Sequence, residues 1–255
     1  MKILHTIILA VVQGLTEFLP VSSSGHLILL EKFGIGEEDV FFNVMLHVGT
    51  LLAVLVEMRK EWLPLVKKPI QKTTGLIVVA CIPTVVLALV FKLAFPSLLT
   101  GKFLGFGFVL TALLLFVGEN FKIAQNNVLS VKTSVLSGVL QGIAVLPGVS
   151  RSGATISTLT FLGVEKRDAA NFSFLLSIPI ILGSAILEII DLARGGFSLS
   201  CPWYCIVVGV VVSFLSGLVA IKFFLKLISK HSLAVFVVYT LALGVVTTLI
   251  PVFGK

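Results

Sequence analysis

The chain has 255 residues, of which 57% are hydrophobic and only 12% are charged, and its mean hydropathy is +1.14. This composition excludes an ordinary soluble domain and is typical of a protein that lies in a lipid bilayer. The net charge of +7 does not indicate a nucleic-acid partner, because the basic residues occur in short loops between apolar runs and not in one patch. We therefore predict an all-α integral membrane protein that contacts membrane lipids and no nucleic acid.

Apolar segments follow one another along the whole chain. The first, 3–19, begins after Lys2 like a signal peptide, but Gln13, Glu17 and Pro20 interrupt its far end and no small-residue cleavage site follows. We therefore predict that it is part of the mature protein. Six later runs of spanning or near-spanning length predict six transmembrane helices, at 40–57, 73–91, 103–118, 170–190, 203–228 and 232–253.

Two further apolar stretches are each broken by a polar loop. Runs at 3–19 and 24–30 flank the first loop, and runs at 133–146 and 153–162 flank the second. The runs in each pair are too short to cross the membrane separately. Non-helical backbone is tolerated at membrane depth only where protein or a watery cavity covers it. We predict two re-entrant helical hairpins whose loops face each other inside the bundle.

The two polar loops are versions of one another, 128 residues apart. Gln13-Gly14 and the segment 20–25 correspond to Gln141-Gly142 and the segment 147–153. Since the spacing is about half the chain, it predicts an internal duplication, with repeats of approximately 1–120 and 130–255 in a single membrane domain, 1–255. Three spans between the hairpins would make these repeats inverted.

The distribution of Lys and Arg predicts the orientation, because cytoplasmic loops carry an excess of both. Placing 57–72 in the cytoplasm groups it with 119–132, 163–168 and 222–231, and the first hairpin then enters from outside. Twelve basic residues lie inside and six outside, with Arg151 left at membrane depth. The inside set is Arg59, Lys60, Lys67, Lys68, Lys72, Lys122, Lys132, Lys166, Arg167, Lys222, Lys226 and Lys230, and the outside set is Lys2, Lys32, Lys92, Lys102, Arg194 and Lys255.

The first loop holds the only carboxylate of the two motifs. Gln13 and Glu17 are four residues apart and so share one face of a helix. A carboxylate buried in a bilayer costs at least about 2.5 kcal/mol unless it is partnered, which makes Glu17 a functional candidate, with a structural ion pair as the alternative. His26 is expected within reach of a serine hydroxyl or a leaving group. His47 either approaches the same cavity or is a hydrogen-bonded structural histidine.

Hydroxyl groups surround the start of the next helix. Ser22, Ser23 and Ser24 follow Pro20 and supply an N-cap, and Gly25 permits close backbone approach. The free amides at such a helix N-terminus attract phosphate.

The second loop differs from the first in its chemistry. Arg151 occupies the position of Ser23, and Val145 and Ala154 replace Glu17 and His26. Arginine offers a charged fork of donors suited to phosphate oxygens, although it could also merely pair with Glu17. Together the two loops predict a site for a lipid phosphate or pyrophosphate. The second loop adds neutral polar or small groups at Ser150, Ser152, Gly153 and Thr155.

The chain closely resembles the undecaprenyl-pyrophosphate phosphatase family, also called the bacitracin-resistance family. The resemblance covers essentially the whole chain and is carried by Gln13-Gly-Leu-Thr-Glu17-Phe-Leu-Pro-Val-Ser-Ser-Ser-Gly-His26 and Leu146-Pro-Gly-Val-Ser-Arg151-Ser-Gly-Ala-Thr155. It implies an enzyme of the bacterial cytoplasmic (inner) membrane that hydrolyses the terminal phosphate of the polyprenyl pyrophosphate carrier. It also implies recycling of that carrier for peptidoglycan synthesis and low-level bacitracin resistance.

The resemblance also implies roles for individual residues. Glu17, Ser23, His26 and Arg151 are the expected catalytic residues, with Gln13 and Glu17 holding Mg²⁺ or Ca²⁺. Because this chain has Gln at the first acidic position, a site with two carboxylates is in doubt. The expected substrate-binding residues are Gln13, Ser22, Ser24, Gly25, His47, Ser150, Ser152, Gly153 and Thr155.

Some alternatives stay open at this point. Either Ser23, activated by His26, attacks the phosphorus, or His26 activates a water directly. The rival function is a lipid-carrier transporter or flippase, since inverted repeats with broken helices are a transporter architecture. The oligomeric state is also open, with a homodimer as one option.

Overall fold

The computed structural model describes residues 2–36, 39–124, 128–195 and 201–249, and every regular element in these ranges is a helix. Four helices are long and apolar enough to cross a bilayer, which fits a multi-pass membrane protein. They coincide with four of the predicted spans to within five residues at either end. These helices are α3 (Val40–Glu57), α5 (Lys72–Ala94), α9 (Lys166–Gly195) and α10 (Trp203–Ile228).

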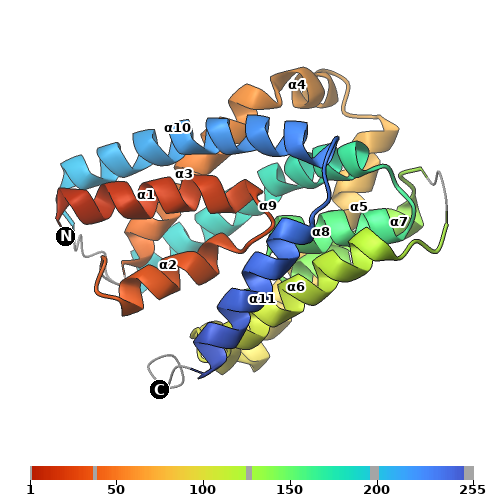
Figure 1. Ribbon diagram of the computed structural model, residues 1–255. Coiled ribbons are helices and arrows are strands. Elements are labelled where there is room, and N and C mark those ends of the chain that lie inside the picture. The colour runs from red at the N-terminus through yellow and green to blue at the C-terminus, as the bar shows by residue number, and fades with distance from the viewer. Residues whose placement is uncertain (1, 37–38, 125–127, 196–200, 250–255) are drawn as a thin grey trace.

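The predicted spans at 103–118 and 232–253 correspond to shorter helices, α6 (Leu104–Asn120) and α11 (Ala234–Leu249). A helix of this length rises only about 25 Å, against roughly 30 Å of hydrocarbon. Residues 250–253 of the second predicted span lie outside the described ranges. The two helices pack side by side (Figure 1). Gly105 allows this contact, because a Cβ there would lie 2.9 Å from the Gly244 carbonyl oxygen.

Each polar loop joins two short helices. The first joins α1 (Ile3–Phe18) to α2 (Ser23–Lys32), and the second joins α7 (Val131–Ile143) to α8 (Arg151–Phe161). Helix α1 ends before Leu19, which is extended because a proline follows it.

Equivalent serines cap the second helix of each pair. The Ser22 hydroxyl oxygen accepts a hydrogen bond from the Gly25 amide at 3.3 Å, and that of Ser150 accepts one from the Gly153 amide at 3.1 Å. The N-cap expected at the start of α2 is therefore present, and α8 has an equivalent one.

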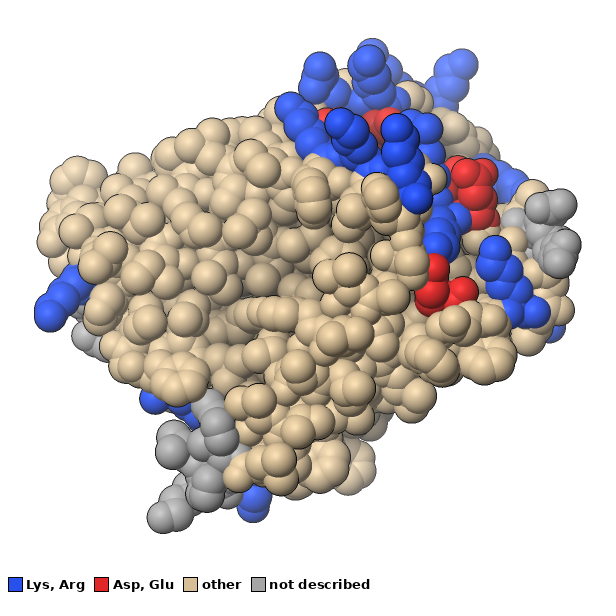
Figure 2. Space-filling model, viewed as in Figure 1, with Lys and Arg blue, Asp and Glu red and all other residues tan. Residues whose placement is uncertain are grey.

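A short helix that the hydropathy pattern does not reveal, α4 (Arg59–Lys67), lies outside the bundle within the segment predicted to be cytoplasmic (Figure 1). It has nine residues and none of them is buried. The Trp62 indole N–H ties it to α3 by donating to the Leu55 carbonyl oxygen at 2.7 Å. Lys and Arg side chains gather at this end of the molecule, as Figure 2 shows. A single-turn 3-10 helix, η1 (Pro96–Leu99), follows α5.

Close helix packing holds each hairpin against one of the long helices. Helix α1 packs on α10, and α7 packs on α5. Small residues permit the contacts: a Cβ at Gly14 would lie 1.9 Å from the Ser216 hydroxyl oxygen, and one at Gly142 would lie 2.7 Å from Leu87. Such residues favour helix association in lipid, where no hydrophobic force drives it.

Candidate active site

The two polar loops touch, as the two matching motifs predict. The Ser152 hydroxyl on the second hairpin donates to the Leu19 carbonyl oxygen on the first at 3.2 Å. Gly25 also allows the approach, since a Cβ there would lie 3.1 Å from the Gly148 Cα. Side chains from both halves of the chain therefore share one site.

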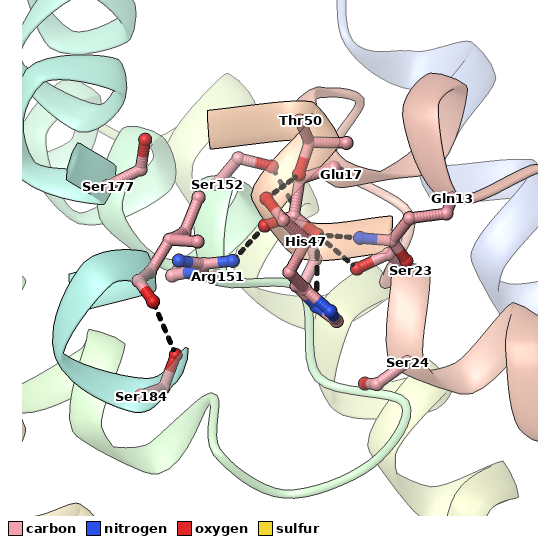
Figure 3. Close-up of polar contacts among 12 residues, drawn as sticks. Gln13, Glu17, Ser23, Ser24, His47, Thr50, Arg151, Ser152, Ser177 and Ser184 are labelled. Atoms are coloured by element: carbon pink, nitrogen blue, oxygen red, sulfur yellow. Dashed lines mark hydrogen bonds and ion pairs between the residues drawn. The ribbon is translucent and has the colours of Figure 1, made fainter. Parts of the chain in front are cut away.

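Glu17 lies at the centre of this site, with a side chain only 1% exposed. One carboxylate oxygen, Oε1, accepts from the Arg151 guanidinium. The other, Oε2, accepts from the Ser23 hydroxyl at 2.6 Å and from the Gln13 amide nitrogen at 2.9 Å. Figure 3 shows Arg151 and Ser23 reaching the carboxylate from opposite sides. The predicted residues Gln13, Glu17, Ser23 and Arg151 thus form one cluster.

The Glu17–Arg151 pair joins two opposite charges that lie 134 residues apart. An isolated carboxylate buried in a membrane protein would be costly, and the arginine supplies the counter-charge for Glu17. Arg151 remains 22% exposed on its side chain, whereas Glu17 is closed off. The arginine is therefore the partner that can turn toward an incoming anion.

All members of the cluster except Gln13 line a cavity of about 220 Å³. At roughly 30 Å³ per water, this is room for about seven water molecules, enough for a phosphate group and some solvent. Most of its polar lining consists of neutral hydroxyl and amide groups. The predicted residues on its wall are Glu17, Ser22, Ser23, Ser24, His47, Ser150 and Arg151.

His47 combines the two roles that the sequence left open. Its Nδ1 donates to the Asn43 carbonyl oxygen at 2.8 Å, which fixes the ring on α3. Its Nε2 lies 3.7 Å from the Glu17 carboxylate, and the ring lines the cavity. The histidine is therefore held structurally and also faces the site.

His26 lies in the first turn of α2, and its ring contacts groups other than the Ser23 hydroxyl. Its Nδ1 is 2.7 Å from the Ser22 carbonyl oxygen, and its Nε2 is 2.7 Å from the Tyr239 hydroxyl on α11. Both ring nitrogens are thus engaged away from Ser23, whose hydroxyl donates to Glu17 instead. The imidazole turns back along α2 to its own N-cap, so the contact that a Ser23 nucleophile activated by His26 would need is not formed in this structure.

Other predicted binding residues shape the second loop instead of lining the cavity. The Thr155 hydroxyl lies 2.5 Å from that of Ser173 on α9. The Gly153 amide is used by the cap on Ser150, and the Ser152 hydroxyl bonds across to the first hairpin. These groups hold Arg151 in place through the backbone of α8.

The cavity also has polar residues that the sequence did not predict, Thr16, Thr84, Gln141 and Ser184. The Gln141 amide nitrogen donates to the Thr84 hydroxyl at 3.0 Å. Gln141 is the counterpart of Gln13 in the second motif, so the match between the motifs is a signal that could have found it. A single threonine inside the apolar run of α5 gave no such signal.

The two predicted metal ligands, Gln13 and Glu17, supply only part of the oxygen shell that a hard cation needs. Gln13 Oε1 is buried and has no hydrogen-bond partner, which suits a ligand oxygen. Among the described residues that line the cavity, Glu17 is the one carboxylate, and no group of three or more His, Cys, Asp or Glu in the described ranges could hold a metal. Since Mg²⁺ and Ca²⁺ take six or more oxygens, these two residues fit such an ion only if phosphate oxygens and water complete its shell.

A helical membrane bundle with a buried Glu–Arg pair, clustered hydroxyls and two capped helix N-termini defines an integral membrane protein with an anion site suited to phosphate. Residues 6–246 match the family described as bacitracin resistance protein BacA. The chain belongs to this family, as the two sequence motifs predict.

Curated relatives called undecaprenyl-diphosphatase match along nearly the whole chain. One from Carboxydothermus hydrogenoformans is 41% identical over 262 residues, covering 100% of both chains. One from Christiangramia forsetii is 39% identical and one from Halothermothrix orenii is 36% identical, each with 96% of both chains covered. This chain is therefore similar to them over nearly its whole length.

Proposed function

We propose that the protein is an undecaprenyl-diphosphate phosphatase, which hydrolyses the phosphoanhydride of undecaprenyl pyrophosphate to the lipid monophosphate and inorganic phosphate. The family and the names of the relatives support this activity. The structural observation that carries it is Glu17, held between Arg151 and Ser23 on the wall of a membrane-embedded cavity. The reaction recycles the lipid carrier for cell-wall synthesis and withdraws the pyrophosphate form that bacitracin sequesters.

In the proposed mechanism Ser23 is the nucleophile and Glu17 is its base. The Ser23 oxygen attacks the terminal phosphorus while its proton passes to Glu17, and the bond from that phosphorus to the bridging oxygen breaks. The lipid monophosphate leaves, and water then cleaves the phosphoserine to release phosphate. The Ser23–Glu17 hydrogen bond supports this pairing. Its length of 2.6 Å is typical of a hydroxyl group that donates to a charged carboxylate.

Arg151 supplies charge for the phosphate. Its fork of donors suits phosphate oxygens, and it moves from Glu17 toward the pyrophosphate when the anion enters. Glu17 and Gln13 would hold Mg²⁺ or Ca²⁺ beside the phosphates, and the ion would neutralise part of their charge. The unpaired Gln13 oxygen supports this role.

The test is phosphate release from a polyprenyl pyrophosphate by the purified protein in detergent. We expect steady release with Mg²⁺ or Ca²⁺, loss with a chelator and recovery when the ion is returned in excess. Glu61→Gln, on the exposed face of α4, serves as a matched control and should behave like the wild type. Lipid movement across vesicles without any phosphate release would instead favour a transporter.

We also propose six transmembrane helices and two re-entrant hairpins arranged as an inverted repeat, with α6 and α11 spanning as a pair. Equivalent contacts support it. The Ser216 hydroxyl donates to the Ala10 carbonyl oxygen at 3.3 Å, and the Thr84 hydroxyl donates to that of Gly138 at 2.9 Å. Ala10 and Gly138 are 128 residues apart, the spacing of the two motifs.

We propose further that the protein lies in the bacterial cytoplasmic (inner) membrane with its site open to the outer side. A second cavity, of about 320 Å³, shares Ser24, His47 and Val145 with the first. It continues to Glu31 and Leu99, which neighbour the loops predicted to be outside. This continuity supports entry of the phosphate group from that face.

Single cysteines at Phe33 and Ile70 test this orientation in a background lacking Cys81, Cys201 and Cys205. Both positions are exposed, at 67% and 100%. A membrane-impermeant maleimide added to intact spheroplasts should label Phe33→Cys and reach Ile70→Cys only after lysis. Labelling of both from the same side contradicts the proposed topology.

A further inference from the structure

The first polar loop contains an unusual backbone conformation. Ser22 has φ +69°, and among the described residues it is the one non-glycine residue with a positive φ. L-residues other than Gly, Asn and Asp rarely adopt this region because Cβ crowds the backbone, so such strain persists only where the surroundings impose it. Ser22 directly precedes Ser23, whose hydroxyl bonds Glu17.

The second loop also leads to a serine-capped helix, but without this strain. Ser150, the counterpart of Ser22, has an ordinary φ of −78°. The positive φ falls instead on Gly148, at +88°, where glycine adopts it at little cost. The two loops also differ at the position of His26, which Ala154 occupies in the second. The strained serine therefore occurs only in the loop that has the histidine.

His26 holds the strained residue by its carbonyl group. The Ser22 carbonyl oxygen accepts from the His26 backbone amide at 3.2 Å and from the imidazole Nδ1 at 2.7 Å. Because a carbonyl oxygen only accepts, Nδ1 carries the proton in the neutral ring and Nε2 accepts from the Tyr239 hydroxyl at 2.7 Å. One chain of hydrogen bonds thus runs from Tyr239 through His26 to Ser22.

Aromatic contacts fix the same imidazole. The ring of Tyr239 stacks on it with centroids 5.7 Å apart and planes 11° apart. Phe108 on α6 meets it edge-on, with centroids 5.6 Å apart. Two helices of the bundle therefore set the orientation of a side chain that grips the active-site turn.

We propose that Tyr239 and His26 are positioning residues, which hold Ser22 in the left-handed conformation and thereby keep the Ser23 hydroxyl on Glu17. The inference rests on the proposed function for its activity readout, and it assigns Tyr239 a role in the reaction without contact with the substrate. Without the hydrogen bonds from Tyr239 and His26, Ser22 relaxes to a negative φ. The Ser23 hydroxyl then turns away from the Glu17 carboxylate.

A double-mutant cycle between Tyr239→Phe and Ser22→Gly tests the proposal. Tyr239→Phe removes the hydroxyl and keeps the ring, and we expect kcat for phosphate release to fall about tenfold, or 1.4 kcal/mol, with KM changed less than about twofold. Glycine at 22 adopts the positive φ without strain and replaces a serine N-cap at little cost. In the Ser22→Gly background the same change should therefore lower kcat by less than about threefold.

Rescue by glycine is the outcome that a merely structural or acid–base role would not give. An equal fall in kcat in both backgrounds overturns the proposal, as does a Tyr239→Phe protein with wild-type kcat. His26→Gln should be rescued by Ser22→Gly in the same way, whereas loss of a catalytic base would not be. Tyr204→Phe is the matched control, because it removes the same hydroxyl group from a tyrosine on α10 whose ring packs against Trp203.

Hydrogen exchange gives a second reading that does not depend on activity. We expect faster amide exchange in the peptide spanning 19–26 for Tyr239→Phe than for the wild type, and a smaller increase in the Ser22→Gly background. If Tyr239→Phe leaves exchange in that peptide unchanged, the positioning role of Tyr239 is overturned, even if the protein releases no phosphate. If the wild type releases no phosphate but the variants show this exchange pattern, only the proposed function is refuted.

Discussion

Replacing Arg151 by alanine is expected to abolish phosphate release and also to destabilise the protein. Removal of a phosphoryl-clamping arginine typically costs about 10³-fold or more in rate. The same change leaves Glu17, 1% exposed, without its arginine counter-charge. Breaking one partner out of a buried ion pair costs about 3–5 kcal/mol in the free energy of unfolding. Phosphate release and thermal unfolding in detergent measure the two effects.

A second variant separates the two consequences. In Glu17→Gln/Arg151→Met neither charge remains, so we expect unfolding close to that of the wild type while phosphate release stays absent. Arg151→Lys keeps the charge but loses the planar fork and should recover stability more than activity. Arg59→Ala on the exposed helix α4 controls for loss of a cation. Normal turnover in Arg151→Ala would remove the arginine from the proposed mechanism.

The sequence predicted much of this site because its signals are local. Glu17, Ser23 and Arg151 stand in two matching motifs, and a polar interruption in an apolar run marks a buried loop whatever the tertiary structure. The long spans were predictable for the same reason, since apolar length is a property of one segment. Helix α4, at nine residues, is too short to give that signal.

The direction of the His26 imidazole could not be predicted in this way. Its spacing from Ser23 places it one turn along the same helix, and the spacing alone favoured a contact between them. The imidazole direction depends on Tyr239, 213 residues further along the chain, and on Phe108 from a third helix. Partners that distant leave no pattern in the local sequence.

The sequence predicted a site role for Gln13 but not for its counterpart Gln141. The duplication pairs them, and both keep a buried amide oxygen without a hydrogen-bond partner. Only Gln13 was singled out, because a carboxylate follows it, whereas Val145 follows Gln141. In the structure Gln141 bonds Thr84 instead and lines the cavity. Symmetry of sequence therefore located the residue, but its surroundings set its role.

Replacing Ser23 by alanine is expected to lower phosphate release by on the order of 10³-fold or more, since the proposed nucleophile is removed. The fold should survive, because Glu17 keeps its bonds to Arg151 and Gln13. Rapid acid quenching of the wild-type reaction followed by peptide mapping should recover a phosphopeptide containing Ser23. Ser229→Ala, at the exposed end of α10, is the matched serine control.

The alternative to a serine nucleophile is direct attack by water, and the same experiment separates the two. If Glu17 activates a water, Ser23→Ala removes one of three groups that bond the carboxylate and should retain a substantial fraction of the activity. No phosphopeptide would then accumulate. Because both routes use Glu17 as the base, Glu17→Gln abolishes release in either case. Only Ser23 therefore distinguishes covalent catalysis from direct hydrolysis at this carboxylate.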